Sequence, residues 1–281
     1  MQILQSPAEV QKITREWGAP VALVPTMGAL HAGHLSLVEI ARSVAKRVVV
    51  SIFVNPLQFA QGEDLAKYPR TFDADVSLLR EKGVDLLFAP EATEFYPRGF
   101  STKVHVSGLT DSLCGASRAG HFEGVTTVCL KLFQVTSAQF AVFGEKDFQQ
   151  LRVIEQMVED LNLPLDIVRG PIVREADGLA MSSRNRYLSP VERRLASRIP
   201  EAIKAVHSFG PDAVVRDVIE GARRLLGDIS VDYLHVCSEF TLRPEGPEVL
   251  LSKILSPHFF LAVKIGQTRL IDNTPLHGVT T

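Results

Sequence analysis

"VALVPTMGALHAGHLSLVEIARSVAKRVVVSIFV", from Val21 to Val54, contains the pattern that decides the fold of this chain. Residues 21–26 form a short apolar run that is typical of a strand. Residues 33–46 place their polar side chains on one stripe at helical spacing and therefore predict an amphipathic helix. Residues 47–54 are apolar and rich in β-branched side chains, as in a strand buried on both faces. The stretch predicts a strand–helix–strand unit with parallel strands.

The same alternation continues toward the C-terminus. Three further helix-like segments are each followed by a strand-like run: 73–83 by 84–90, 122–135 by 139–143, and 147–162 by 165–170. Repeated units of this kind build a parallel sheet with helices on both faces. We therefore expect a doubly wound, Rossmann-like α/β domain over residues 1–175.

The pattern changes after residue 175. Two helical segments, 190–209 with a break or kink at Pro200 and 211–226, precede two strand-like runs, 231–236 and 259–272. A run of helices and then strands is typical of an α+β arrangement. We expect a smaller α+β C-terminal domain over residues 176–281.

Composition narrows the class of protein. The chain has 281 residues, 46% hydrophobic and 22% charged, which is typical of a soluble globular protein. A net charge of −2 gives no support for a nucleic-acid or membrane partner. Cys114, Cys129 and Cys237 are too scattered for a disulfide framework or a zinc site. We find no signal peptide and no apolar run of about 20 residues, and expect a cytoplasmic location.

Polar residues follow the first strand-like run directly, and ligands of open parallel sheets bind beyond the carboxyl ends of the strands. Gly28 allows backbone N–H groups to approach a phosphate, and the start of the next helix offers N–H donors and a positive dipole end. His31 and His34 lie on one side of the first helical turn. These features predict a phosphate-binding loop; the alternatives are surface histidines or a partial metal site.

Two segments indicate recognition of a small polar substrate. Asn55, Gln58 and Gln61 follow a buried strand, and neutral amides suit hydroxyl and carboxylate groups. Arg118 and His121 precede an apolar helix, where an anion is favoured. The alternatives are a long surface loop and a helix start with incidental charges.

Two more segments supply cations. Lys146 stands at a helix start, where a positive charge opposes the dipole and therefore indicates an anionic ligand. Ser182, Ser183 and Arg184 place two hydroxyls and a fixed cation on a loop that could close over a nucleotide. The alternatives are an exposed Lys146–Asp147 pair and a polar linker.

Together these segments resemble the pantoate–β-alanine ligase family. The motifs run in order across nearly the whole chain: PTMGALHAGH (25–34), FVNPLQF (53–59), YPRT (68–71), RAGHFEGV (118–125), FGEKDFQQL (143–151), READGLAMSSRNRYL (174–188) and TRLIDN (268–273). The H-x-G-H element is shared with a wider nucleotidyltransferase superfamily. The segment GASRAGHF (115–122) departs from the family by lacking a proline that often stands there.

The resemblance implies an ATP-dependent reaction in vitamin B5 and coenzyme A synthesis. (R)-Pantoate and ATP would give pantoyl adenylate and pyrophosphate, and β-alanine would convert the adenylate to pantothenate and AMP. Mg²⁺ would arrive with ATP. The protein would be a homodimer whose smaller domain acts as a lid, and the loop 55–70 would help to close the site.

The resemblance also implies which residues carry the reaction. His31, His34, Lys146 and Arg184 would be catalytic, with His34 as proton donor. The ATP site would be lined by Met27, Gly28, Ala29, Leu30, His31, Ala32, Gly33, His34, Gly144, Glu145, Lys146, Asp147, Val173, Met181, Ser182, Ser183 and Arg184. Pantoate and β-alanine would be contacted by Gln58 and Gln150, with Pro25, Asn55, Tyr68, Arg118 and His121 as further candidates. Asp75 would be the protein contact for Mg²⁺.

Other functions fit parts of this pattern. Another H-x-G-H nucleotidyltransferase that acts on a small carboxylate or phosphate is the nearest alternative. A tRNA synthetase is disfavoured because no basic anticodon-binding extension is visible. A non-catalytic nucleotide-binding module is disfavoured because His34, Lys146 and Arg184 are all present.

Overall fold

The structure, a computed structural model, describes residues 1–59 and 68–277. The chain forms two compact units. The N-terminal unit comprises residues 1–107, 117–145 and 153–171, and the C-terminal unit comprises 108–116, 146–152 and the chain from 172 onward. The two short segments join the C-terminal unit through contacts such as Ser112 Oγ donating to the Leu242 carbonyl and Phe148 stacking on His258.

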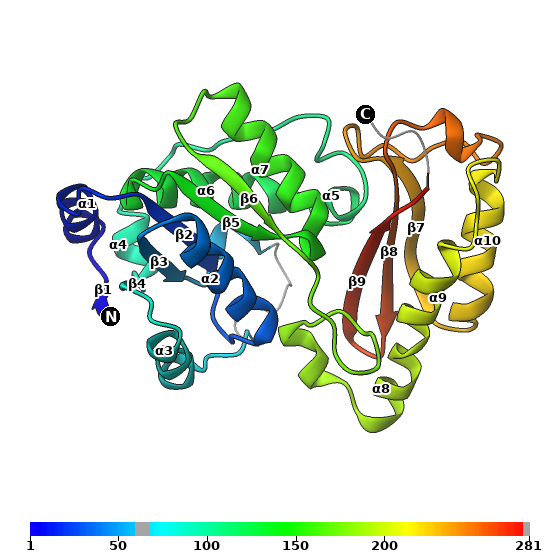
Figure 1. Cartoon of the computed structure of the whole chain (residues 1–281), viewed down its shortest axis with the longest axis horizontal. Helices are drawn as coiled ribbons and strands as arrows, with labels where there is room; N and C mark the ends of the chain where they lie inside the picture. The colour runs from blue at the N-terminus through cyan, green and yellow to red at the C-terminus, as the bar shows by residue number, and fades with distance from the viewer. Residues whose placement is uncertain (60–67, 278–281) are drawn as a thin grey trace. The chain divides into compact units, whose positions relative to one another are not determined.

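A six-stranded parallel sheet forms the centre of the N-terminal unit (Figure 1). Its order is β1-β4-β3-β2-β5-β6. The strands are β1 (Gln2–Leu4), β2 (Val21–Thr26), β3 (Arg47–Ile52), β4 (Leu86–Phe88), β5 (Phe140–Gly144) and β6 (Asp166–Gly170). The doubly wound sheet predicted from the sequence is confirmed, and the short edge strand β1 is an addition. Because β2 lies between β3 and β5, the strand order reverses beside the carboxyl end of β2, where such sheets bind ligands.

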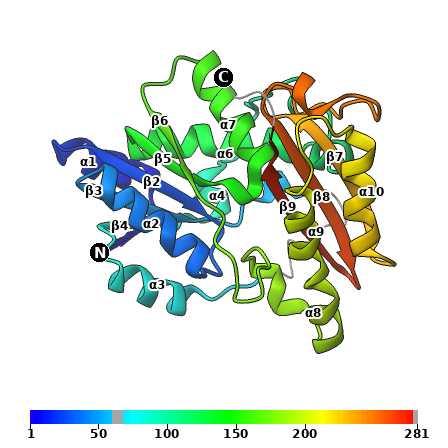
Figure 2. The same ribbon diagram turned by 45° about the vertical axis from the view of Figure 1, so that its right-hand side comes forward.

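Helices cover both faces of this sheet (Figures 1 and 2). They are α1 (Pro7–Glu16), α2 (Ala32–Val44), α3 (Phe72–Glu81), α4 (Ala92–Phe95), α6 (His121–Thr136) and α7 (Phe148–Asp160). Helix α2 packs on β2, β3 and β5, burying Leu37, Val38 and Ala41, while α6 packs on the opposite face together with α1. None of the described helices is long and apolar enough to cross a membrane.

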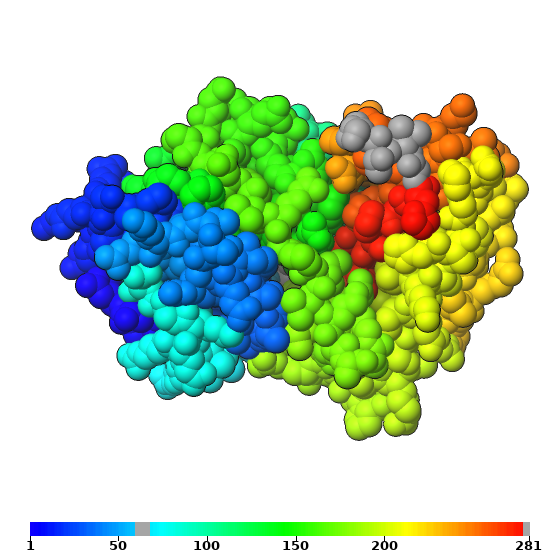
Figure 3. All heavy atoms as spheres, in the orientation of Figure 1, coloured from blue at the N-terminus to red at the C-terminus, as the bar shows by residue number. Residues whose placement is uncertain are grey.

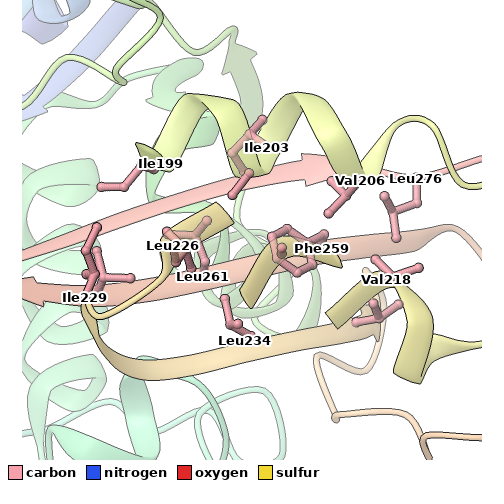
Figure 4. Close-up of a cluster of buried hydrophobic side chains, with 14 of the residues drawn as sticks. Ile199, Ile203, Val206, Val218, Leu226, Ile229, Leu234, Phe259, Leu261 and Leu276 are labelled. Atoms are coloured by element: carbon pink, nitrogen blue, oxygen red, sulfur yellow. The ribbon is translucent and has the colours of Figure 1, made fainter. Parts of the chain in front are cut away.

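A three-stranded antiparallel sheet forms the C-terminal unit, in the order β7 (Ser230–Ser238), β8 (Pro257–Ile265) and β9 (Thr268–Pro275). Its helices are α8 (Pro190–Ala196), α9 (Arg198–Val206) and α10 (Val215–Leu226), and α5 (Cys114–Ser117) is a short turn. Figure 4 shows Ile203 of α9 and Val218 of α10 in one cluster with Phe259 and Leu261 of β8. Helices α9 and α10 form much of the surface of this unit on the face drawn in Figure 3.

Two sequence expectations for this unit need correction. The single strand expected over 259–272 is two strands, because Gly266 adopts a left-handed φ of 58° and closes a hairpin. The helix expected over 190–209 is interrupted at Ser197, and Pro200 lies in the first turn of α9. A proline is tolerated there because the first-turn N–H groups have no partner within the helix.

Candidate active site

The loop after β2 is built around one buried carboxylate. Gly28 and Ala29 adopt left-handed φ values of 82° and 54°. This conformation directs the N–H groups of Ala29 and Leu30 to the two oxygens of Asp75, at 2.9 Å each. Asp75 lies on α3 and is 2% exposed. A Cβ at Gly28 would stand 3.2 Å from this carboxylate, so the positive φ and the tight space both favour glycine.

Asp75 is therefore a structural residue of the loop. Its carboxylate also accepts a hydrogen bond from the Thr71 hydroxyl at 3.1 Å. Within residues 1–59 and 68–277 no group of three or more His, Cys, Asp or Glu side chains could hold a metal ion. The predicted contact between Asp75 and Mg²⁺ gains no support from this geometry.

The two histidines of the H-x-G-H motif face each other at the start of α2. Their ring centroids are 4.0 Å apart. The backbone N–H of His31 points at Nδ1 of His34, at 3.4 Å. Because Nδ1 faces a donor, a neutral His34 carries its proton on Nε2. This tautomer leaves Nε2 as a donor, and the role of His34 as proton donor stays a prediction.

Two of the predicted side chains, Asn55 and Gln58, meet after β3. Asn55 is 1% exposed and Gln58, in the 3₁₀ turn Pro56–Gln58, is 8% exposed. The Asn55 amide donates to Gln58 Oε1 at 3.0 Å, and Gln58 Nε2 lies 3.1 Å from the sulfur of Met27. Tyr68 faces Phe59 edge-on, with ring centroids 6.2 Å apart. Gln61 and most of the predicted closing loop lie outside the described residues.

Arg118 and His121 hold the backbone of Gln58. His121 begins α6 and places Nδ1 2.8 Å from the Gln58 carbonyl, while the Arg118 guanidinium lies 2.9 Å from Nε2. A carbonyl only accepts and a guanidinium only donates, so these two contacts select the tautomer of His121 with its proton on Nδ1. These contacts give both residues a supporting role, and their direct contact with substrate stays a prediction.

The predicted cations belong to two segments of the chain. Lys146 lies in the 3₁₀ turn Glu145–Asp147 between β5 and α7. Its ammonium is 3.9 Å from the Asp147 carboxylate, at the limit of an ion pair. Its carbonyl accepts a hydrogen bond from Asn273 Nδ2 at 2.9 Å. Gln150 lies half-buried in α7. The pair with Asp147, which the sequence offered as the alternative, is thus present at this distance, although the Lys146 side chain is only 20% exposed.

The second cation segment is a narrow turn. The Met181 N–H donates to the Val173 carbonyl at 2.9 Å, which brings the two ends of the turn together. Ser182 then caps the 3₁₀ turn Ser183–Tyr187, its hydroxyl accepting from the Arg184 N–H at 3.2 Å. Val173, Met181 and Ser182–Arg184 are thus neighbours, and their contact with ATP stays a prediction.

Charged residues that sequence reasoning did not assign hold this turn. Asp272, almost fully buried in β9, accepts two hydrogen bonds from Arg174, at 2.7 and 3.0 Å. Arg193 pairs with Glu175 at 2.7 Å and with Asp177 at 2.6 Å. The hydrogen bond from Arg193 lowers the pKa of Asp177. The signal for Asp272 was its charge within an apolar strand, inside the TRLIDN motif.

Gln149 was also missed. It is 6% exposed, and its amide accepts from the Cys114 N–H at 2.9 Å and donates to the carbonyls of Leu109 and Ser112. Gln149 therefore anchors the segment 108–116, whereas its neighbour Gln150 remains the substrate candidate. Sequence alone could not separate the roles of two adjacent glutamines.

The doubly wound sheet, the glycine loop at its switch point and the paired histidines define the class: an α/β protein of the nucleotide-binding type. A family model for pantoate–β-alanine ligase matches residues 2–275. The chain belongs to the pantoate–β-alanine ligase family.

Relatives of this chain align with it over nearly the full length of both sequences. The pantothenate synthetase of Heliobacterium modesticaldum is 48% identical over 97% of this chain and 98% of its own. The pantothenate synthetase of Moorella thermoacetica is 46% identical over 98% of this chain and 99% of its own. The solved pantothenate synthetase of Thermus thermophilus is 44% identical with a TM-score of 0.89, covering 98% and 99%. The Francisella tularensis ligase, solved in complex with beta-gamma ATP and β-alanine, is 32% identical with a TM-score of 0.81, covering 98% and 97%.

These comparisons confirm the family and the fold expected from the motifs. They make the chain a ligase that forms pantothenate, and they do not favour another H-x-G-H nucleotidyltransferase.

Proposed function

We propose that the chain joins (R)-pantoate to β-alanine in two steps. A carboxylate oxygen of pantoate attacks the α-phosphorus of ATP, which gives pantoyl adenylate and releases pyrophosphate. The amine of β-alanine then attacks the acyl carbon and loses a proton, and AMP leaves. The observation that carries the proposal is the fixed loop 27–34, which ends with His34 at the positive end of α2.

Adenylation needs positive donors around the phosphates. Its transition state spreads charge over phosphate oxygens, so positioned cations and N–H groups stabilise it most. We assign this role to His31, His34, Lys146 and Arg184, with the hydroxyls of Ser182 and Ser183. The remaining predicted ATP contacts are the backbone groups of residues 27–34, 144–147, 173 and 181.

Pantoate recognition falls to Gln58 and Gln150 in this proposal, with Pro25, Asn55, Tyr68, Arg118 and His121 around them. Mg²⁺ would enter with ATP. It usually keeps several waters and binds through phosphate oxygens, which fits described residues that offer no carboxylate cluster of their own. A homodimer, a cytoplasmic location and closure of the 173–184 loop over ATP are further parts of the proposal, supported by the family resemblance.

ATP–pyrophosphate exchange tests the first step directly. We expect exchange that requires pantoate and proceeds without β-alanine. If exchange requires β-alanine, or if pantoate does not support exchange, the first step does not form pantoyl adenylate from pantoate and ATP alone.

Removing a cation tests the residue assignments. Lys146→Ala and Arg184→Ala should each lower the exchange rate by about 100-fold or more, because each removes charge stabilisation from the transition state. Arg186→Ala is the matched control, since Arg186 is an exposed arginine of the same 3₁₀ turn. A large fall in Tm for the first two variants, with equal activity loss in the control, would assign these residues to structure instead.

A further inference from the structure

Tyr96 lies outside the proposed site, yet its hydroxyl reaches the amide beside Gln58. Tyr96 follows α4, and its Oη donates to Asn55 Oδ1 at 2.9 Å. The Tyr96 ring lies 5.4 Å from the Phe95 ring and 4.9 Å from the Phe100 ring. The Lys131 ammonium stands 4.8, 5.7 and 5.1 Å from the Phe95, Tyr96 and Phe100 rings. This packing fixes where the hydroxyl points.

Backbone groups determine which way the Asn55 amide faces. The Leu57 N–H donates to Asn55 Oδ1 at 3.2 Å, and the Gly124 carbonyl accepts from Asn55 Nδ2 at 3.0 Å. An N–H can only donate and a carbonyl can only accept, so a flipped amide would lose both bonds. The Tyr96 hydroxyl must therefore donate. Burial, with the nearby Cys129 second, raises the pKa of Tyr96 far above its ordinary value and keeps this hydroxyl protonated.

The orientation of the Asn55 amide determines the orientation of the Gln58 amide. The second hydrogen on Asn55 Nδ2 points to Gln58 Oε1, at 3.0 Å. The oxygen of Gln58 is thereby used as an acceptor, and its Nε2 faces the sulfur of Met27, a weak acceptor, at 3.1 Å. His121 holds the Gln58 carbonyl at 2.8 Å, which fixes the main chain from which this side chain extends. Gln58 therefore presents N–H groups.

We propose that Tyr96 is a positioning residue: its hydroxyl donates to Asn55 Oδ1 beside the Leu57 N–H and so strengthens the Asn55 orientation that sets Gln58 as a hydrogen-bond donor. This makes the Gln58 position specific for an acceptor atom of the acid substrate. The acceptor is a carboxylate or hydroxyl oxygen, and a protonated amine is rejected because it would meet an N–H group. The inference rests on the proposed contact between Gln58 and pantoate. Tyr96 donates to Asn55 and Asn55 donates to Gln58, so Tyr96 acts on the substrate only through these two residues.

Tyr96→Phe tests the proposal most cleanly, because it keeps the ring, its aromatic neighbours and the contact with Lys131. We expect the KM for pantoate to rise about threefold to tenfold, the effect of losing one hydrogen bond, while the KM values for ATP and β-alanine stay unchanged. Asn55→Asp should raise the pantoate KM by more than about tenfold. The introduced carboxylate can accept from Tyr96 and Leu57 but cannot donate to Gln58, so the Gln58 amide would turn over.

Two comparisons separate positioning from packing. Phe100→Leu loosens the same ring cluster without removing a hydroxyl, so it should lower Tm and leave the pantoate KM unchanged. In a Gln58→Ala background, Tyr96→Phe should add nothing to the pantoate KM, because the two residues act as one unit. Independent, multiplicative effects would overturn the proposal.

The outcome for the wild type keeps the two hypotheses distinct. If the wild type shows no pantoate-dependent exchange, the proposed function fails. If the wild type shows that exchange and Tyr96→Phe has an unchanged pantoate KM, only the role of Tyr96 fails.

Discussion

Two loops that carry predicted ATP contacts are stabilised in opposite ways. The loop 27–34 is held through its main chain: the N–H groups of Ala29 and Leu30 bind the buried Asp75. The loop 173–184 is held mainly through side chains, by Arg174 on Asp272 and by Arg193 on its two carboxylate partners. Arg193 is 27% exposed and one partner, Asp177, is 39% exposed.

This difference indicates how easily each loop can change its conformation. A buried N–H group that loses its partner costs about 1–3 kcal/mol, so the loop 27–34 has one well-defined shape. The partly exposed pairs of Arg193 contribute about 0–1 kcal/mol each, so releasing the part of the loop that they hold costs little, whereas the pair of Arg174 with the buried Asp272 is expensive to break. This suits a loop that admits a ligand and then closes over it.

The largest expected effect comes from Asp75→Asn. An amide can accept on one atom only, so its NH₂ group would face one of the two loop N–H donors. We expect a loss of about 1–3 kcal/mol in the free energy of unfolding, measured by denaturant titration, together with weaker ATP binding. Asp73→Asn, at an exposed position of the same helix, is the control and should cost only a few tenths of a kcal/mol. Equal costs for the two variants would break the comparison.

A smaller effect is expected from Arg193→Met, which keeps the apolar stem and removes the charge. The free energy of unfolding should fall by at most about 1 kcal/mol, and the difference from wild type should shrink in high salt. Arg194→Met, one residue on, is the matched control. A cost as large as that of Asp75→Asn would mean that the second loop is as firmly fixed as the first.

The smallest effect is a pH dependence near the second loop. His207 shares a 2.8 Å hydrogen bond with Thr274, and burial, with His277 and Arg174 adding repulsion, lowers the pKa of His207 below its ordinary 6.5. Above about pH 6.5 the folded and unfolded chains both hold His207 neutral. As the pH falls below that value, the unfolded chain takes up a proton that the folded protein resists, so stability decreases until the lowered pKa is reached.

His207→Asn should therefore flatten the decline of Tm between about pH 7 and pH 5. His105→Asn removes an exposed histidine and should leave the slope as it is. A slope that both variants leave unchanged would remove His207 as its source and point to other groups, such as the half-buried His235, whose pKa burial also lowers.

Much of the fold was predictable because its signals are local. The stretch 21–54 became β2, α2 and β3 as its periodicity indicated. The elements that were missed have weak local signals: β1 is only 3 residues long, and α1 buries only Val10 and Thr14. The hairpin between β8 and β9 was missed because the apolar pattern continues on both sides of Gly266, whose left-handed φ alone marks the turn.

The sequence by itself determined the α/β class, the family and the set of residues that carry chemistry, because apolar periodicity and short motifs are properties of neighbouring positions. Only the tertiary structure decided what those residues touch. Asp75 turned out to shape a loop 46 residues away, and Tyr96 to donate a hydrogen bond to an asparagine 41 residues away. Hydrogen bonds join groups that folding brings together, and their direction depends on every partner at once, so the chain order of residues does not encode them.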